Sequence, residues 1–222
     1  MEQEINKKLK GERKKVNTSP TEGQIKAGNY AKGHITIGGF NITIENPKGS
    51  YRKGVDDNGK EWKTLMKNDY GYFTKTLGKD GDAIDVFIGS AIKDNDFKIF
   101  PIDQYINGKF DETKVMLGFP DKESAKAAYL ANYEKDWKGF KYITEIDIET
   151  FKKWLYDGNR QRKPFAKYSE IKKNKISEEK MKDTKRKIYL TEGQFKNYLR
   201  LVMQEEKKHK YIKDLLTSCR NK

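Results

Sequence analysis

The chain has 222 residues, of which 36% are charged and 35% hydrophobic, which suits one domain of ordinary size with polar tails. Its 13 Tyr, 11 Phe and 3 Trp argue against wholesale disorder, because disordered chains contain few aromatic residues. The sequence has no apolar run of about 18 residues and no apolar stretch typical of a signal peptide. Its one cysteine, Cys219, excludes an internal disulfide, and we expect a cytoplasmic protein without a membrane span.

The net charge of +14 is unevenly distributed along the chain. Residues 160–222 contain 20 Lys and Arg against 8 Asp and Glu, and residues 1–15 contain 6 against 3, whereas residues 16–159 contain 21 against 22. Basic ends attract nucleic acid or anionic surfaces, although they are also common as solvated tails. We predict a basic N-terminal arm (1–22), a folded domain (23–158), a basic linker (159–188) and a C-terminal amphipathic helical tail (189–222).

The N-terminal arm is rich in lysine and has few apolar anchors, so we expect it to be mobile or loosely helical. The domain then begins with alternating residues at 35–37 and 40–45, which predict two strands joined in a hairpin at Gly38-Gly39. His34 precedes the first strand and fits either a ligand or base, or a hydrogen-bonded structural residue.

The middle of the chain contains two further predicted strands, at 60–66 and 97–103. Asp121 is typical of a helix N-cap, and apolar residues at intervals of four predict a helix from there to about Asp136. A second helix is predicted over residues 147–156, and Gly158 ends it.

The C-terminal tail has its own helix signal. Thr191 to Gln194 form a capping-box pattern, and the residues behind them place one apolar stripe on a helix. A single amphipathic helix of this length is marginal alone, so it must dock on the domain, on a second copy of the chain as a homo-oligomer, or on another partner.

Three acidic residues, Asp80, Asp82 and Asp85, stand within a short loop that leads into an apolar strand. Carboxylates this close repel one another unless a cation lies between them, and their hard oxygens suit Mg²⁺ or Ca²⁺. An EF-hand is excluded, because the spacing from Asp80 puts Ile84 and Ala91 where that loop needs ligands.

The segment from Tyr70 to Gly89 resembles the signature of the soluble family I inorganic pyrophosphatases. That signature has Asp-Gly-Asp, usually Pro, an apolar residue, Asp and another apolar residue, preceded by a Tyr-Gly-Tyr/Phe segment that ends in Thr-Leu; here Ala83 stands in place of Pro. The opening at 27–34 is similar to a divergent branch found in phage and mobile-element proteins, for which the host cytoplasm would be the setting. The resemblance implies an α+β, mainly β fold: an OB-like closed β-barrel with flanking helices.

The resemblance also implies a set of site residues. Asp82 corresponds to the base that orients or deprotonates the nucleophilic water, and the ion is Mg²⁺. The basic phosphate-gripping residue is Arg52 or Lys53, and the second late acid is Asp111 or Glu112. An Arg usual in the family is absent between Arg52 and Tyr70, where Lys60 or Lys63 stands instead. The complete set comprises Asp82, Glu45, Tyr70, Lys114, Arg52, Lys53, Tyr133 and Lys135 as catalytic residues, and Asp80, Asp82, Asp85, Asp103 and Asp111 as metal ligands; Tyr133 also fits a core position.

These residues imply Mg²⁺-dependent hydrolysis of inorganic pyrophosphate to two phosphates by metal-activated water. An alternative is a catalytically degenerate domain that binds nucleic acid or a phage component through its basic ends, in keeping with the missing Arg and Ala83. Hydrolysis of another phosphoanhydride, such as a nucleoside triphosphate, is a third option, but the sequence contains no Gly-rich phosphate loop and no base-stacking motif.

Overall fold

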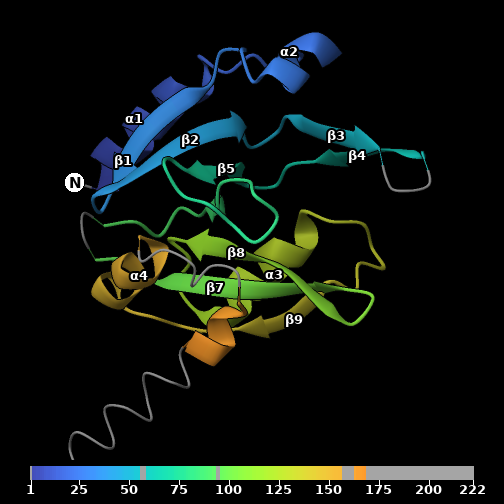
Figure 1. The fold of residues 1–222 in the computed structure, drawn as a ribbon. Coiled ribbons are helices and arrows are strands. Elements are labelled where there is room, and N and C mark those ends of the chain that lie inside the picture. Colours follow the sequence, from blue (N-terminus) through green and yellow to red (C-terminus); the bar gives the residue numbers. More distant parts are fainter. Residues whose placement is uncertain (1, 56–58, 94–95, 157–162, 169–222) are drawn as a thin grey trace, which may run out of the picture. The chain divides into compact units, whose positions relative to one another are not determined.

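A computed structural model describes residues 2–55, 59–93, 96–156 and 163–168, all of which belong to one structural unit, residues 1–172 (Figure 1). The predicted C-terminal helix, its capping box and most of the linker lie outside the described residues. Nucleic-acid binding and self-association through that tail therefore stay predictions.

The elements are α1 (Glu2–Arg13), α2 (Glu22–Ala27), β1 (Gly33–Ile37), β2 (Phe40–Asn46), β3 (Tyr51–Val55), β4 (Glu61–Leu65), β5 (Asp69–Phe73), β6 (Asp85–Ile88), β7 (Ile99–Ile106), β8 (Lys109–Leu117), α3 (Lys122–Ala131), β9 (Phe140–Ile143) and α4 (Ile148–Leu155).

The described strands form a seven-stranded mixed sheet in the order β1-β2-β5-β6-β8-β7-β9 and a separate hairpin of β3 and β4. Only β6 and β8 pair in parallel, and the other neighbours are antiparallel. The mainly β, α+β class is confirmed. The predicted barrel closure is not seen in the pairing of the described strands, because β1 and β9 stand at the two ends of the order.

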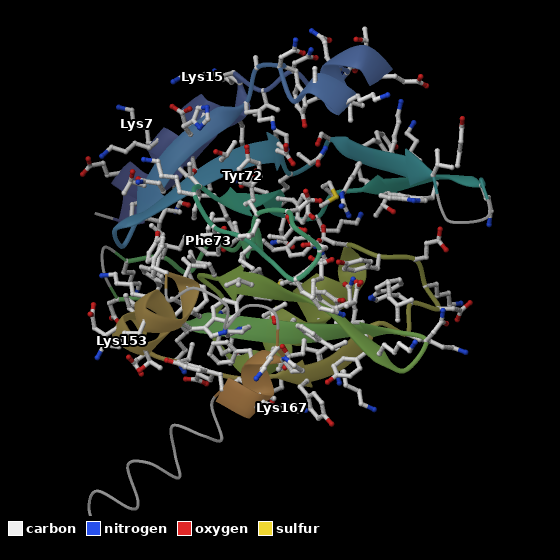
Figure 2. The ribbon with its side chains drawn as sticks, viewed as in Figure 1. Lys7, Lys15, Tyr72, Phe73, Lys153 and Lys167 are labelled. Atoms are coloured by element: carbon white, nitrogen blue, oxygen red, sulfur yellow. The ribbon has the colours of Figure 1, made fainter. Side chains whose placement is uncertain are left out.

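Two apolar clusters lie on opposite faces of the sheet, because alternate side chains of a strand point to opposite sides. On β6, Val86 and Ile88 join one cluster with α4, whereas Phe87 joins the other with Tyr129 of α3. Figure 2 shows Phe73 of β5 inside the domain, where it belongs to the α4 cluster, while lysines such as Lys153 point outwards. The same alternation determines which polar side chains point to the face of the sheet that α3 covers.

The first helix is docked, where the sequence led us to expect a mobile or loosely helical arm. Leu9 is 1% exposed and joins the α4 cluster, and Glu12 accepts a hydrogen bond of 2.9 Å from the backbone N–H of His34 at the start of β1. His34 itself takes the structural role, because its Nδ1 lies 3.3 Å from the hydroxyl of Thr43.

The predicted hairpin and helices are largely confirmed. Gly38 and Gly39 join β1 to β2 with φ values of 57° and 83°, the left-handed region that glycine adopts readily. Asp121 and Asp147 cap α3 and α4 by accepting hydrogen bonds of 2.7 Å from Ser124 and Thr150. Helix α3 ends at Ala131, five residues before the predicted end, and the next side chain, that of Asn132, accepts from the backbone N–H of Lys67 and donates to Asn68 in the loop before β5.

Phe165, which we assigned to the basic linker, is fully buried and packs on Trp154 at 5.0 Å between ring centroids. Among the described residues, no helix is both long and apolar enough to cross a membrane.

Candidate active site

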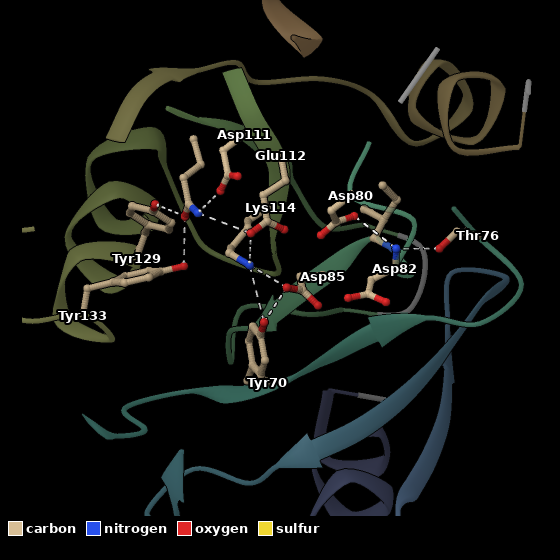
Figure 3. A network of polar contacts seen from close by, with 12 residues as sticks. Tyr70, Thr76, Asp80, Asp82, Asp85, Asp111, Glu112, Lys114, Tyr129 and Tyr133 are labelled. Carbon is tan, nitrogen blue, oxygen red and sulfur yellow. Dashed lines mark hydrogen bonds and ion pairs between the residues drawn. The ribbon is translucent and has the colours of Figure 1, made fainter. Parts of the chain in front are cut away.

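The centre of the candidate site is the ammonium group of Lys114, on β8. Its Nζ lies 2.5 Å from a carboxylate oxygen of Asp85 on β6 and 2.7 Å from one of Glu112, two residues earlier on the same face of β8. The hydroxyl of Tyr70 on β5 donates to the same Asp85 oxygen, and it lies 3.4 Å from the ammonium (Figure 3). Three neighbouring strands thus bring a cation, two acids and a phenol together.

The protonation of this cluster follows from its burial and its charges. Burial alone lowers the pKa of Lys114, but the negative charge of Asp85 and the other neighbours outweighs it and raises that pKa well above its ordinary value. Burial raises the pKa of Glu112, and the charge of Asp85 adds to the rise while Lys114 opposes it. Burial and Asp85 also raise the pKa of Tyr70. Lys114 is therefore a fixed cation, and Tyr70 a neutral donor, near neutral pH.

Gln104 of β7 connects this cluster to α3, although it is not among the predicted site residues. Its side-chain N–H donates to Asp111 at 2.8 Å and to Glu112 at 3.3 Å. Its carbonyl oxygen accepts from the hydroxyls of Tyr129 at 2.8 Å and Tyr133 at 3.2 Å. Both alternatives for the late acid, Asp111 and Glu112, therefore lie in the network, but only Glu112 contacts Lys114.

The hairpin of β3 and β4 supplies a second cation, Arg52. The guanidinium of Arg52 lies 4.5 Å from the ring centre of Tyr70 and 5.4 Å from that of Trp62, whereas Lys53 is on the exposed face of β3. Arg52 and Lys114 both line a cavity of about 470 Å³. Two cations therefore line the same cavity as Asp111 and Glu112.

Of the other predicted donors, Tyr133 lines the cavity and Lys135 does not. Lys60 also lines it, whereas Lys63 lies 3.9 Å from the ring centre of Tyr51 on the outer face of the hairpin. Lys60 is thus the better placed of the two lysines that stand where the family has an Arg.

The acidic loop between β5 and β6 is held by its own backbone. The N–H of Asp82 donates to a carboxylate oxygen of Asp80 at 3.1 Å, and Gly81 adopts a φ of 95°. Asp80 is close enough to Glu112 to contribute to its raised pKa. Figure 3 shows Asp80 and Asp82 toward one end of the network and Asp85 at its centre, where it contacts Lys114 and Tyr70.

Two predicted acids are not brought to this cluster. Glu45 is paired with Lys32 at 2.6 Å and accepts from Tyr30 at 3.0 Å, in a neighbouring group next to Tyr72. Asp103 is 1% exposed and points to the opposite face of β7, where it accepts from Thr113 and from the backbone N–H groups of residues 165 and 166.

The residues present have the oxygen donors that Mg²⁺ prefers, but they are not arranged as a complete metal site. Within the described part of the chain, no group of three or more His, Cys, Asp or Glu side chains is arranged to hold a metal ion. Asp85 and Glu112 are instead paired with Lys114. The remaining oxygens of Asp80, Asp82, Asp85, Asp111 and Glu112 are the hard ligands that Mg²⁺ prefers.

Comparisons with known proteins identify the family of the chain. A family model described as inorganic pyrophosphatase matches residues 22–156. An inorganic pyrophosphatase from Coxiella burnetii shares 17% identity and a TM-score of 0.30, over 52% of this chain and 90% of that one. An inorganic phosphatase from Anaplasma phagocytophilum shares 15% identity and a TM-score of 0.19, over 48% and 67%. A search of curated proteins found no match.

Proposed function

The chain belongs to the inorganic pyrophosphatase family, and from that premise we propose that it hydrolyses inorganic pyrophosphate to two phosphates with the help of Mg²⁺. The observation that carries the proposal is the buried Lys114 between Asp85 and Glu112, at the edge of a cavity that Arg52 also lines. A small and highly charged substrate needs such fixed donors more than it needs apolar surface.

The donors act on the charge that develops during hydrolysis. Lys114 and Arg52 bind the phosphate oxygens and stabilise negative charge on the leaving phosphate, because preorganised donors in a poorly solvated site are effective at that task. Neutral Tyr70 and Tyr133 donate their hydroxyl protons to Asp85 and Gln104, and so hold these two side chains in place beside the cations. Lys60 offers a third cation, but as a point charge it does not replace a bidentate Arg.

Asp80, Asp82, Asp85 and Glu112 are the residues that would hold Mg²⁺, with Asp111 as a further candidate. When bound, Mg²⁺ lowers the pKa of water and screens the phosphate oxygens. Asp82 is assigned the proton-accepting role. Support for this comes from its place in the acidic loop, next to Asp80 and outside the Lys114 ion pairs. Asp103 is not assigned to the metal, because three protein hydrogen bonds already occupy its oxygens.

The test is release of phosphate from pyrophosphate by the full chain, with and without Mg²⁺. Wild type is expected to release phosphate only with Mg²⁺, and Asp82→Asn is expected to lower kcat by about 100-fold or more, the range of a lost general base. Asp96→Asn is the matched control, because Asp96 is an exposed acid away from the cavity lining. Absence of phosphate release, or full activity of Asp82→Asn, would remove the proposal.

A further inference from the structure

The cavity beside Lys114 is larger and more aromatic than pyrophosphate needs. Its volume of about 470 Å³ falls in the range of pockets that bind whole organic ligands. Its lining includes the charged side chains Arg52, Lys114 and Glu112, and it also includes the indole rings of Trp62 and Trp137. Inorganic pyrophosphate has no apolar group to contact such rings.

Both tryptophans are seated against a glycine. A Cβ added at Gly54 would come within 2.3 Å of the ring of Trp62, and one at Gly139 within 2.2 Å of the ring of Trp137. Only glycine lets each ring approach the backbone this closely. Trp137 also stacks on Tyr133 at 4.6 Å with an interplanar angle of 9°. Both rings are thus held close to the backbone, and both line the cavity.

Arg52 connects Trp62 to the cluster around Lys114. Its guanidinium is 5.4 Å from the ring centre of Trp62 and 4.5 Å from that of Tyr70, whose hydroxyl belongs to the Lys114 cluster. A ligand held there would place its anionic part against Arg52 and Lys114. A planar group attached to it would lie toward the indoles, where base–aromatic stacking is favourable for any nucleobase.

We propose that the substrates of this site include nucleoside diphosphates, with the base against Trp62 and Trp137 and the diphosphate against Arg52 and Lys114. The proposal rests on the proposed function, since it uses the same hydrolytic cluster. The oxygen of water adds to the terminal phosphorus, and the bond from that phosphorus to the bridging oxygen breaks. The bridging oxygen leaves on the nucleoside monophosphate, free phosphate is the other product, and one proton passes to solvent.

Binding is measured by calorimetry on the full chain with Mg²⁺ and two non-hydrolysable probes. The first is adenosine 5′-(α,β-methylene)diphosphate, and the second is methylenediphosphonate, which lacks the nucleoside. Wild type is expected to bind the nucleotide probe about tenfold more tightly, the scale of one stacked base. Trp62→Leu is expected to reduce the preference to about threefold, because Trp137 remains, and Trp62→Phe to keep most of the difference. Tyr51→Leu, on the outer face of the same hairpin, is expected to change neither Kd.

Equal Kd values for the two probes in wild type overturn this inference even if Trp62→Leu does not fold. A tenfold preference that survives in folded Trp62→Leu overturns the placement of the base against Trp62 and Trp137. Phosphate release from pyrophosphate is measured in parallel. Its absence removes the proposed hydrolysis, whereas its presence with equal Kd values removes only the nucleotide proposal, so the two failures are distinguishable.

Discussion

The guanidinium of Arg13 in α1 donates hydrogen bonds of 2.8 and 2.6 Å to the two carboxylate oxygens of Asp69, the first residue of β5. The backbone N–H of Lys48 donates to the same carboxylate at 2.9 Å. Asp69 is 1% exposed and directly precedes Tyr70, whose hydroxyl reaches the Lys114 cluster. The N-terminal helix therefore anchors the strand that positions a candidate catalytic phenol.

Arg13→Gln is expected to lower the free energy of unfolding by about 2–3 kcal/mol, because it leaves a buried carboxylate without its cation. The loss stays below that for a fully buried pair, since the Arg13 side chain is 34% exposed. Urea unfolding followed by circular dichroism measures the change. Lys8→Gln is the control, because it removes an exposed pair with Glu4, for which a change below about 0.5 kcal/mol is expected. Equal losses for the two variants would show that α1 is not anchored by Arg13.

The local motif was predictable from the sequence because its spacing is fixed within one loop and two strands. Tyr70, Asp80 and Asp85 lie in one motif that resembles the family signature and needs no long-range information. For the late acid, the resemblance leaves Asp111 and Glu112 open. The hairpin at Gly38-Gly39 and the N-caps of α3 and α4 were equally local signals.

Features that depend on pairing between distant segments were not predictable in the same way. Whether Arg52 or Lys53 faces the site depends on how the β3–β4 hairpin meets β5. Order along the chain points to Asp103 as a site residue, yet Ile102 pairs with Lys114, so alternation puts Gln104 on the side of the site and Asp103 on the other. The two-residue period would have revealed this once that register was known.

Lys114→Gln is expected to lower kcat for pyrophosphate by about 100- to 1,000-fold, because it removes a fixed donor to the developing charge. It also leaves Asp85 and Glu112 without their shared cation, so a loss of stability of about 3 kcal/mol should accompany it. Both are measured, by phosphate release and by urea unfolding. Lys98→Gln, which removes the exposed pair with Glu145, should change neither. Full activity in folded Lys114→Gln would exclude Lys114 from catalysis.

We expect Asp103 to affect the pH dependence of stability and not catalysis. Burial raises its pKa above the ordinary value of 3.8, although three hydrogen bonds oppose the rise. A carboxyl whose pKa is raised on folding contributes stability that is fully present below the unfolded pKa and is lost as pH rises through the folded pKa. The stability advantage of wild type over Asp103→Asn should therefore be largest below about pH 4 and shrink as the pH rises above it.

Asp103→Asn also turns an amide N–H₂ toward backbone donors, which costs about 1–3 kcal/mol at neutral pH. Urea unfolding at several pH values measures both effects, and phosphate release should stay within a few-fold of wild type. An advantage of wild type that grows with pH, or a loss of activity as large as that of Asp82→Asn, would contradict the placement of Asp103 outside the site.

Gln104 offers the sharpest test of where Mg²⁺ binds. Glu at this position keeps the acceptor for Tyr129 and Tyr133, but it replaces the N–H₂ that donates to Asp111 and Glu112 with a carboxylate oxygen. Without metal, the three carboxylates repel one another, and the free energy of unfolding in a chelator should fall by about 1–3 kcal/mol. With Mg²⁺, the same three form a better site for a hard cation.

Mg²⁺ should therefore raise the unfolding midpoint of Gln104→Glu more than that of wild type, because a ligand that binds only the folded state stabilises it according to its affinity. Thermal unfolding across a Mg²⁺ titration measures this. Gln24→Glu is the matched control, since Glu serves equally well at that capping-box position of α2 and introduces the same charge away from the cavity. If Mg²⁺ stabilises Gln104→Glu no more than wild type, the ion binds away from Asp111 and Glu112, and the acidic loop alone would have to hold it.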